Sequence, residues 1–279
     1  MDKKILIHQI FYNDRTKNLL DSNFIPLDNT KNERPDWYEF WVIRNFLMNN
    51  NINENSWYGF FSPKFFFKTG LSSNQLINFI EKYSINKDVI LIGSAWDQIA
   101  YFQNQFIQGE FYHPKILSLS QEIFNKMKIK INLENLISHS LSSQYSNFII
   151  AKKKYWSKWL DLANKFFEFC ENNNNNLSKE MNENTTYGSK ANMVPIKTFI
   201  QERFPSILLN LNNFNVINTN LNKSYPINDK LFKINNKTRE LLSQCDIFKI
   251  KYMSTKNKKY LLLYKETQKK IGIVDLKNH

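Results

Sequence analysis

The sequence predicts an α/β protein. Strand-like apolar runs alternate with amphipathic, helix-like segments along most of the chain, an order typical of a sheet covered by helices. Among the 279 residues, 42% are hydrophobic and 15% aromatic, enough to build a large core. Only 6 Gly and 7 Pro are present. This scarcity excludes collagen-like and Gly-rich phosphate-loop architectures, because both depend on the backbone freedom of glycine.

The first half of the chain contains two predicted strands and two predicted helices. Residues 3–11 (KILIHQIFY) form the first apolar strand, and a polar, turn-rich stretch follows it. Pro35 is suited to open a helix over DWYEFWVIRNFLMNN. Residues 72–84 begin with serines suited to an N-cap and continue with amphipathic spacing. Residues 88–93 (DVILIG) then predict a buried strand.

The second half continues this alternation. Residues 96–110 (WDQIAYFQNQFIQGE) predict one helix, and residues 146–151 (SNFIIA) predict a compact strand. Residues 152–171 predict a long helix whose aromatic residues recur at core spacing. The asparagine-rich residues 171–186 predict an exposed, mobile loop. Residues 194–212 (VPIKTFIQERFPSILLNLN) return to helix.

The positive charge is concentrated near the C-terminus. The formal net charge is +13, and residues 222–279 hold 14 basic and 5 acidic residues, which is +9 of that total. We therefore predict a body over residues 1–221 and a small basic C-terminal appendage over residues 222–279. The aromatic residues of FKIKYMSTKNKKYLLLYK in the appendage look strand-patterned.

Several function classes are disfavoured by what the sequence lacks. Two cysteines, Cys170 and Cys245, cannot form a disulfide framework or a four-cysteine zinc site. No apolar run approaches the roughly 18 residues that a membrane span needs, and the first residues lack a signal-peptide pattern. We therefore expect a cytoplasmic protein. Motifs of P-loop, dinucleotide-binding, zinc-protease and serine-hydrolase sites are absent from the sequence.

The order of several segments resembles a known group of proteins. HQIFYN, YGFFSPKF, KTGLS, EKYSINKDVILIG, WDQIAYFQNQFIQGE, SNFIIAKKKYW and FIQERFPSILLNL follow one another. This series resembles uncharacterised bacterial glycosyltransferase-like proteins of capsule and lipopolysaccharide clusters, which are similar in layout to the type-A (GT-A) glycosyltransferase fold. The resemblance covers roughly residues 3 to 212. It implies a Rossmann-type mixed sheet flanked by helices that binds a nucleotide-diphosphate sugar and transfers the sugar to a glycan or lipid-linked glycan acceptor.

One motif of most type-A enzymes is missing. No two acidic residues are separated by a single residue anywhere in the chain, so the sequence contains no Asp-x-Asp motif. That spacing lets two oxygen ligands hold a hard cation against a diphosphate. We therefore expect no metal cofactor, with Mg²⁺ or Mn²⁺ held by a single Asp and water as the alternative.

Two acidic residues are candidates for the catalytic base. Asp97 follows the predicted strand 88–93, where an α/β enzyme presents side chains to its ligand, and Trp96 and Gln98 would line the same pocket. Inverting transfer needs a carboxylate that takes a proton from the acceptor hydroxyl. The alternative for Asp97 is a helix N-cap. Glu202 is the second choice. It forms a charged pair with Arg203 inside an apolar helix, and the alternative is an architectural salt bridge.

Four residues are candidates for binding the donor nucleotide. His8 and Gln9 lie at the end of the first predicted strand, and by resemblance this edge would hold the nucleotide base. The alternative for His8 is a structural histidine. Arg34 and Asp36 surround Pro35, and an arginine can bind a diphosphate bidentately in place of a metal. The alternative is a local salt bridge or helix cap.

Five further residues are candidates for binding the sugar. Tyr58, Ser62 and Lys64 belong to an aromatic turn, which suits a sugar ring with an apolar face and hydroxyl rim. The alternative is that the aromatic residues of this turn are core. His139 and Asn147 lie in a polar loop that could bond sugar hydroxyls, with His139 as a base of near-neutral pKa. Loop capping is the alternative.

The basic appendage suggests a further partner. Its lysines could attract an anionic inner leaflet of the membrane, where lipid-linked acceptors reside, and charge retained for solubility is the alternative. The residues concerned are Lys249, Lys251, Lys256, Lys258 and Lys259. Nucleic-acid binding through the same appendage is a competing hypothesis, although the nearly neutral body argues against it. A glycan-binding pseudoenzyme is a third.

Overall fold

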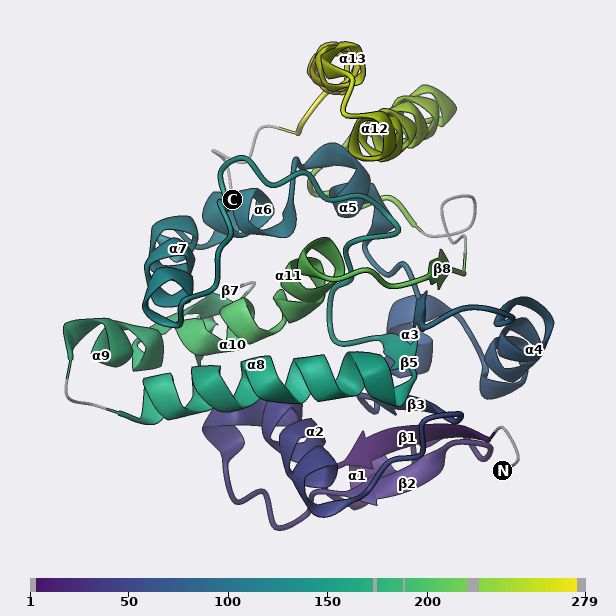
Figure 1. The fold of residues 1–279 in the computed structure, drawn as a ribbon, viewed down its shortest axis with the longest axis vertical. Coiled ribbons are helices and arrows are strands. Elements are labelled where there is room, and N and C mark those ends of the chain that lie inside the picture. Colours follow the sequence, from purple (N-terminus) through teal and green to yellow (C-terminus); the bar gives the residue numbers. More distant parts are fainter. Residues whose placement is uncertain (1–3, 173–174, 188, 220–225, 275–279) are drawn as a thin grey trace.

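A six-stranded sheet between helices forms the body of the protein, as expected for the α/β class (Figure 1). The computed structural model describes residues 4–172, 175–187, 189–219 and 226–274. The strands of the sheet are β1 (Ile5–Phe11), β2 (Ile25–Asp28), β3 (Trp57–Phe61), β4 (Val89–Leu91), β5 (Ile149–Ala151) and β8 (Val216–Asn218). Their order across the sheet is β2-β1-β3-β5-β4-β8.

The sheet is mixed. β1 is parallel to β2 and β3, and β4 is parallel to β8. β5 lies between β3 and β4 and runs antiparallel to both. The five other strands therefore share one direction, and their carboxyl ends meet at one edge of the sheet. Ligands of open α/β sheets bind outside this edge.

Helices cover both faces of the sheet. On one face, α2 (Tyr38–Asn49), α8 (Lys153–Glu171) and α11 (Phe204–Leu211) pack through side chains that include Phe40, Trp159 and Phe204. On the other face, α3 (Phe65–Thr69) and α4 (Ser73–Tyr83) pack through a separate cluster that includes Phe65 and Ile80. Strand residues alternate between the two clusters, because successive side chains of a strand point to opposite faces.

The long aromatic helix α8 is core, as its spacing predicts. Trp156, Trp159 and Phe166 are almost fully buried, and their ring edges contact neighbouring rings of the same core. The Trp156 indole N–H also donates to the Tyr58 carbonyl oxygen of β3 at 3.0 Å. The helix is thus fixed to the sheet by both apolar burial and a buried hydrogen bond.

The remaining elements complete the described chain. The helices are α1 (Asp14–Lys17), η1 (Pro35–Trp37), α5 (Trp96–Tyr101), α6 (Gln105–Tyr112), α7 (Ile116–Lys126), α9 (Asn176–Asn182), α10 (Ile196–Gln201), α12 (Asn236–Thr255) and α13 (Lys258–Lys269). A two-stranded antiparallel hairpin consists of β6 (Asn184–Tyr187) and β7 (Ser189–Pro195).

Two segments that the sequence predicts as single helices are each broken. Residues 96–110 divide into α5 and α6, because Phe102 is extended and Asn104 caps a new helix by accepting from the N–H groups of Phe106 and Ile107. Residues 194–212 divide into α10 and α11. Pro205 lies in the first turn of α11, where its missing N–H costs nothing.

Two other predictions of local structure are wrong. The asparagine-rich segment is not a loop throughout, because the Asn175 side chain accepts from Ser178 N and starts α9. Residues 173–174 of that segment lie outside the described residues. The appendage is helical rather than strand-patterned. Its aromatic residues lie on α12 and α13, which pair closely with each other.

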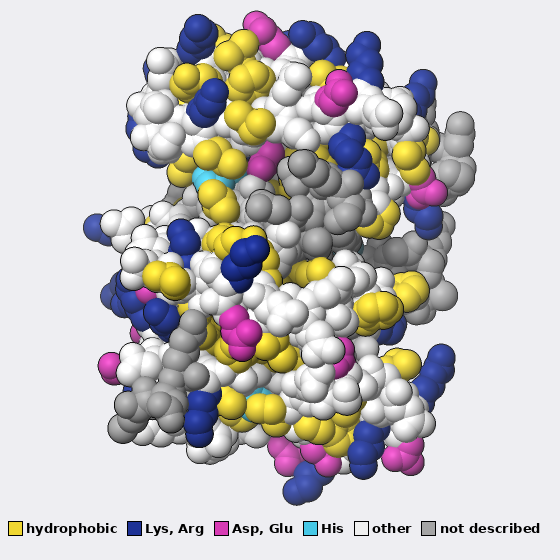
Figure 2. All heavy atoms as spheres, turned by 90° about the vertical axis from the view of Figure 1, so that its right-hand side faces the viewer, with side chains coloured by type: hydrophobic (Ala, Val, Ile, Leu, Met, Phe, Trp, Pro, Cys, Tyr) yellow, Lys and Arg dark blue, Asp and Glu magenta, His cyan; other side chains and the backbone are white. Residues whose placement is uncertain are grey.

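The appendage packs on the body through α5 (Figure 1). Trp96 and Ala100 of α5 share one buried cluster with Leu242 and Tyr264 of α12 and α13. The predicted boundary at residue 221 falls outside the described residues. Figure 2 shows lysine and arginine side chains at the top of the molecule, where Figure 1 places α12 and α13. None of the described helices combines the length and apolar character that crossing a membrane requires.

Two buried polar contacts strengthen this docking. The Lys249 ammonium is fully buried and donates to the carbonyl oxygens of Ile99 and of Phe102, the latter at 2.7 Å. These carbonyls lie at the end of α5, where helix carbonyls lack intrahelical partners. Asp246 accepts from the backbone N–H and the hydroxyl of Ser140 at 2.9 and 2.6 Å.

Candidate functional site

Polar side chains gather at the carboxyl edge of the sheet. We call the following nine residues the carboxyl-edge cluster: Tyr12, Glu39, Ser62, Lys68, Asp97, Tyr145, Asn147, Glu202 and Arg203. They come from the ends of β1, β3 and β4, the segment before β5, the first turn of α2, helix α3 and the α10–α11 junction. The cluster therefore joins residues that are far apart in the sequence.

Electrostatic interactions and a hydrogen bond connect several of these residues. The Glu202 carboxyl interacts with the charges of Lys68, Arg203 and Glu39. The Tyr145 hydroxyl interacts with Arg203, Asp97 and Glu202. The Asn147 side-chain amide donates to Oε1 of Gln201, the residue before Glu202, at 3.4 Å.

Glu202 has the properties of a general base. Its side chain is half-buried, and burial raises the pKa of its carboxyl above the ordinary value. Among the described residues, no hydrogen bond reaches this carboxylate. A carboxylate with a raised pKa and no partner is available to take a proton from a ligand hydroxyl.

Arg203 fixes the backbone beside Glu202. Its guanidinium is buried and donates to the carbonyl oxygens of Gln105 (2.8 Å) and Phe199 (2.6 Å) and to Gln108 Oε1 (2.8 Å). The ion pairs of the described residues do not join Arg203 to Glu202, so the architectural salt bridge considered from sequence is not formed. Burial lowers the pKa of Arg203, and three oxygen dipoles compensate its charge instead of a carboxylate.

Asp97 is almost fully buried. Its Oδ2 accepts from the backbone N–H of Asn228 at 2.8 Å, and burial raises its pKa. The N-cap of α5 is Ala95, so Asp97 does not occupy the capping position considered from sequence. Of its predicted neighbours, Trp96 packs in the cluster between α5 and the appendage, and Gln98 accepts from Gln108 Nε2 at 2.8 Å. Whether Asp97 contacts a substrate stays a prediction.

Tyr145 is one of four cluster residues that the sequence did not single out, the others being Tyr12, Glu39 and Lys68. Its hydroxyl is buried and has no hydrogen-bond partner among the described residues, and the same is true of the Ser62 hydroxyl. Burial raises the pKa of Tyr145, so its hydroxyl remains protonated and can donate. The polar loop before the strand 146–151 indicates a site in this region, but its sequence does not distinguish Tyr145 from the serines around it.

Backbone strain surrounds the cluster. Ser146 and Asn147 have consecutive positive φ angles of 61° and 51°. Ala95, two residues before Asp97, has φ 54°, and Tyr38, beside Glu39, has φ 50° with ψ −139°. Non-glycine residues rarely adopt such angles, and strained residues concentrate at functional sites. Asn147 is itself a member of the cluster, and Ser146, Ala95 and Tyr38 each lie within two residues of a member.

His8 and Gln9 lie inside β1 rather than at its end. The expectation is wrong because Ile10 and Phe11 continue the pairing with β2. The His8 ring packs between Phe46 and Phe60, at centroid distances of 4.6 and 5.3 Å, and burial lowers its pKa to about 4. Gln9 accepts from Asp21 N at 2.8 Å and donates to the Ser62 carbonyl at 3.3 Å, which positions the loop after β3.

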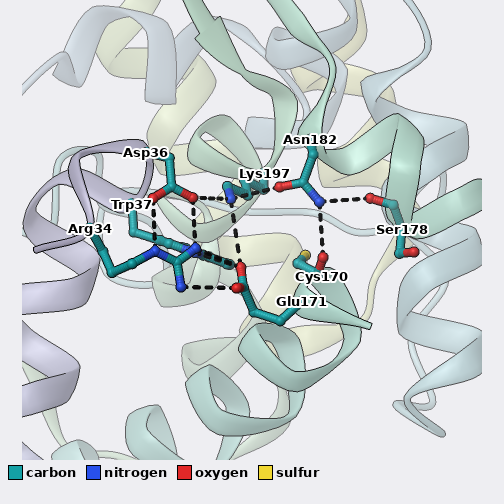
Figure 3. A network of polar contacts seen from close by, with 8 residues as sticks. All are labelled: Arg34, Asp36, Trp37, Cys170, Glu171, Ser178, Asn182 and Lys197. Atoms are coloured by element: carbon teal, nitrogen blue, oxygen red, sulfur yellow. Dashed lines mark hydrogen bonds and ion pairs between the residues drawn. The ribbon is translucent and has the colours of Figure 1, made fainter. Parts of the chain in front are cut away.

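Arg34 and Asp36 belong to a separate ionic network (Figure 3). The Arg34 guanidinium donates to both carboxylate oxygens of Asp36 and to both of Glu171, at 2.8 to 3.0 Å. The buried Lys197 ammonium contacts Asp36 at 2.6 Å and lies 4.2 Å from the centre of the Trp37 ring. Burial opposes ionisation of Asp36, but hydrogen bonds from Arg34 and Lys197 give it a lowered pKa.

The carboxylates of this network already accept the hydrogen bonds that the Arg34 guanidinium would donate to a diphosphate. Both donor edges of Arg34 face protein carboxylates, and the network ties η1 to α8 and α10. The geometry favours the local salt bridge considered from sequence. Contact of Arg34 or Asp36 with a donor stays a prediction.

The remaining candidates lie in three different places. Tyr58 is buried in β3, and its hydroxyl accepts from Asn53 N at 2.9 Å. Lys64 is exposed at the start of α3. His139 is half-buried beside the appendage, and its Nδ1 accepts from Leu141 N at 3.2 Å. The expectation of a near-neutral pKa for His139 is wrong, because burial lowers that pKa to about 4.

The donors of the cluster do not match a cation site. The part of the chain that the structure describes contains no group of three or more His, Cys, Asp or Glu residues suited to hold a metal ion. In the cluster, the Glu39 and Glu202 carboxylates are accompanied by the Lys68 and Arg203 cations, which compete with a metal ion for the same negative charge.

Any assignment of function to this chain rests on the geometry described above, because comparison with known proteins gives no family. Neither a scan of protein-family models nor searches of curated proteins and of solved structures found a match.

Proposed function

We propose that the protein is a glycosyltransferase with a GT-A-like sheet that binds a nucleotide-diphosphate sugar at the carboxyl-edge cluster. The observation that supports this proposal is the Glu202 carboxyl, which has a raised pKa and no hydrogen-bond partner among the described residues, beside two cations. The mixed sheet with helices on both faces is compatible with this fold, and the cluster lies where open α/β sheets hold their ligands. The acceptor is a hydroxyl of a surface glycan.

The proposed step is a single displacement at the anomeric carbon. Glu202 takes the proton of the acceptor hydroxyl as its oxygen forms the bond to that carbon. The bond to the diphosphate oxygen breaks, and the diphosphate leaves with the electron pair. Lys68 and Arg203 supply positive charge near the departing group, and preorganised charge of this kind is a large part of enzymatic rate enhancement.

The unpartnered hydroxyls of the cluster supply the orientation. Tyr145 and Ser62 each present a buried hydroxyl that lacks a partner among the described residues. A buried polar group without a partner costs about 1–3 kcal/mol, and a sugar hydroxyl bound there would remove that cost. Because Lys68 and Arg203 already provide positive charge and the donors do not match a cation site, the step is written without a metal.

A binding screen tests the donor site first. Thermal unfolding is followed with uridine, guanosine and cytidine diphosphates and their sugars. A ligand at 100 times its dissociation constant stabilises the fold by about 2.7 kcal/mol. We expect stabilisation by one base. If no nucleotide stabilises the protein, the proposed donor site is wrong.

Variants of the two acids then test the chemistry. We expect Glu202→Gln to keep donor binding and to lose turnover by about 100-fold or more, because general-base catalysis contributes about that factor. Asp97→Asn compares the other predicted acid, and Glu81→Gln on the exposed face of α4 is the matched control. Full turnover by Glu202→Gln would remove the base from the proposal. Donor binding by the wild type without transfer or hydrolysis would favour a glycan-binding pseudoenzyme.

A further inference from the structure

The outer surface of α12 and α13 carries concentrated positive charge. Residues 251–270 contain seven lysines and one acidic residue, Glu266. All seven lysines are exposed: Lys251, Lys256, Lys258, Lys259, Lys265, Lys269 and Lys270. Lys249, which the sequence grouped with them, is fully buried against α5 and cannot contribute to a contact surface. We call the seven lysines together with Leu262 the hairpin face.

The hairpin face points away from the body. Lys258, Leu262, Lys265 and Lys269 are spaced along α13 so that they share one side of the helix. The opposite side docks on α5, where the Tyr264 hydroxyl and Gln268 Nε2 both donate to the Tyr101 carbonyl oxygen at 2.8 Å. Figure 1 places α13 at the end of the molecule remote from the sheet, and Figure 2 shows basic side chains around an apolar patch there.

An apolar side chain lies within this basic stripe. Leu262 is 62% exposed, with Lys258 one turn before it and Lys265 and Glu266 one turn after it on the same side of α13. Ile247 of α12 is also exposed, at 47%. Lysine stems can lie along apolar surface while their ammonium groups reach phosphate, which is the arrangement of helices that bind at a membrane interface.

The aromatic residues of the hairpin are poorly placed to stack with nucleic-acid bases. Tyr260 and Tyr252 are half-buried, and the ammonium groups of Lys251 and Lys256 lie 5.6 and 6.0 Å from their ring centres. Binding of single-stranded nucleic acid relies on exposed aromatic platforms. The charge and the exposed leucine therefore fit an anionic lipid surface better than an RNA.

We propose that the hairpin face docks the protein on an anionic bilayer. The lysines contact the lipid phosphates, and Leu262 enters the interfacial region. This inference is independent of the sugar chemistry, since it concerns exposed residues of α12 and α13, none of which belongs to the carboxyl-edge cluster. A failed nucleotide screen would leave it unchanged.

Flotation with vesicles tests the proposal. The full chain is mixed with vesicles of phosphatidylcholine alone or of phosphatidylcholine with phosphatidylglycerol. We expect co-flotation only with the anionic vesicles, and release as the salt concentration rises. Equal recovery with both vesicle types, or no recovery with either, would overturn the proposal.

Charge-matched variants locate the contact. The triple variant Lys258→Glu, Lys265→Glu and Lys269→Glu changes three residues of the hairpin face, and we expect its partition coefficient to fall about tenfold or more. The control triple variant alters exposed lysines elsewhere by the same total charge: Lys82→Glu, Lys126→Glu and Lys130→Glu. We expect the control to stay within about twofold of the wild type. Equal losses in both triples would show that net charge, rather than this face, governs binding.

A neutral substitution separates lipid from nucleic acid. Leu262→Ala keeps every charge, and we expect it to weaken vesicle binding several-fold while the circular dichroism spectrum stays unchanged. A single-stranded RNA is tested in parallel by mobility shift. Salt-sensitive RNA binding that the hairpin-face triple abolishes, without vesicle binding by the wild type, would assign the face to nucleic acid and overturn the lipid proposal.

Discussion

Adding one methyl group at Gly109 should destabilise the protein, against the usual effect of this substitution. Gly109 lies inside α6, where alanine normally stabilises a helix by about 1 kcal/mol relative to glycine. A Cβ at this position would lie 2.9 Å from Nη2 and 3.0 Å from Nε of Arg203, and 3.0 Å from Cγ2 of Ile116. Distances near 3.0 Å force a neighbour to move.

The Arg203 guanidinium has little freedom to move aside. Its three hydrogen bonds hold it to the Gln105 and Phe199 carbonyls and to Gln108 Oε1. Overpacking of a fixed core group costs about 1–3 kcal/mol, against a gain in helix propensity of about 1 kcal/mol. We therefore expect Gly109→Ala to lower the free energy of unfolding by up to about 2 kcal/mol.

A double-mutant cycle identifies the cause. Arg203→Met removes the rigid guanidinium and is itself expected to cost about 3 kcal/mol, because it removes three buried hydrogen bonds of a charged donor. In that background, Gly109→Ala should cost at least about 1 kcal/mol less than in the wild type. Urea unfolding followed by tryptophan fluorescence and circular dichroism measures all four proteins. If Gly109→Ala stabilises the wild type, or costs the same in both backgrounds, the clash with Arg203 is not the cause.

Three further predictions concern stability and metal binding. His8→Phe should flatten the loss of stability on acidification, because the folded pKa of His8 is about 4 against 6.5 when unfolded. The wild type should lose up to about 3 kcal/mol relative to the variant between pH 6.5 and pH 4, and parallel pH profiles from chemical denaturation would contradict this. Asp246→Ala should loosen α12, since it leaves the buried Ser140 N–H unpaired, at a cost of about 2 kcal/mol. Hydrogen exchange should then rise across α12 and α13 first, whereas a uniform rise would count against local docking. Calorimetric titration with Mn²⁺ should give no stoichiometric binding with or without nucleotide, and tight binding in the presence of nucleotide alone would disprove metal independence.

Local sequence signals identified the main elements but not their breaks. The strand 3–11, the helix starting near residue 72 and the aromatic helix 152–171 correspond to β1, α4 and α8. Asn104 and Asn175 each start a helix through a side-chain cap. Because the chain contains many other asparagines that do not cap a helix, the sequence alone does not show which asparagines start one.

Long-range pairing accounts for most of what the sequence could not reveal. The antiparallel direction of β5 depends on β3 and β4, which are remote in the chain. The pairing of Arg34 with Glu171, 137 residues away, could not be predicted from local sequence. Glu202 was identified from its charge in an apolar segment, but Tyr145 was not, because its burial beside Arg203 depends on the fold.

The docking of the appendage on α5 affects how the chain folds during synthesis. Trp96 and Ala100 are buried partly by side chains as late in the sequence as Tyr264 and Ile271. Since the ribosome delivers the chain from its N-terminus, the apolar side of α5 is not fully covered until residues as late as Ile271 have emerged. A frameshift or stop codon before residue 264 would therefore leave this surface exposed and act as a folding defect in the body.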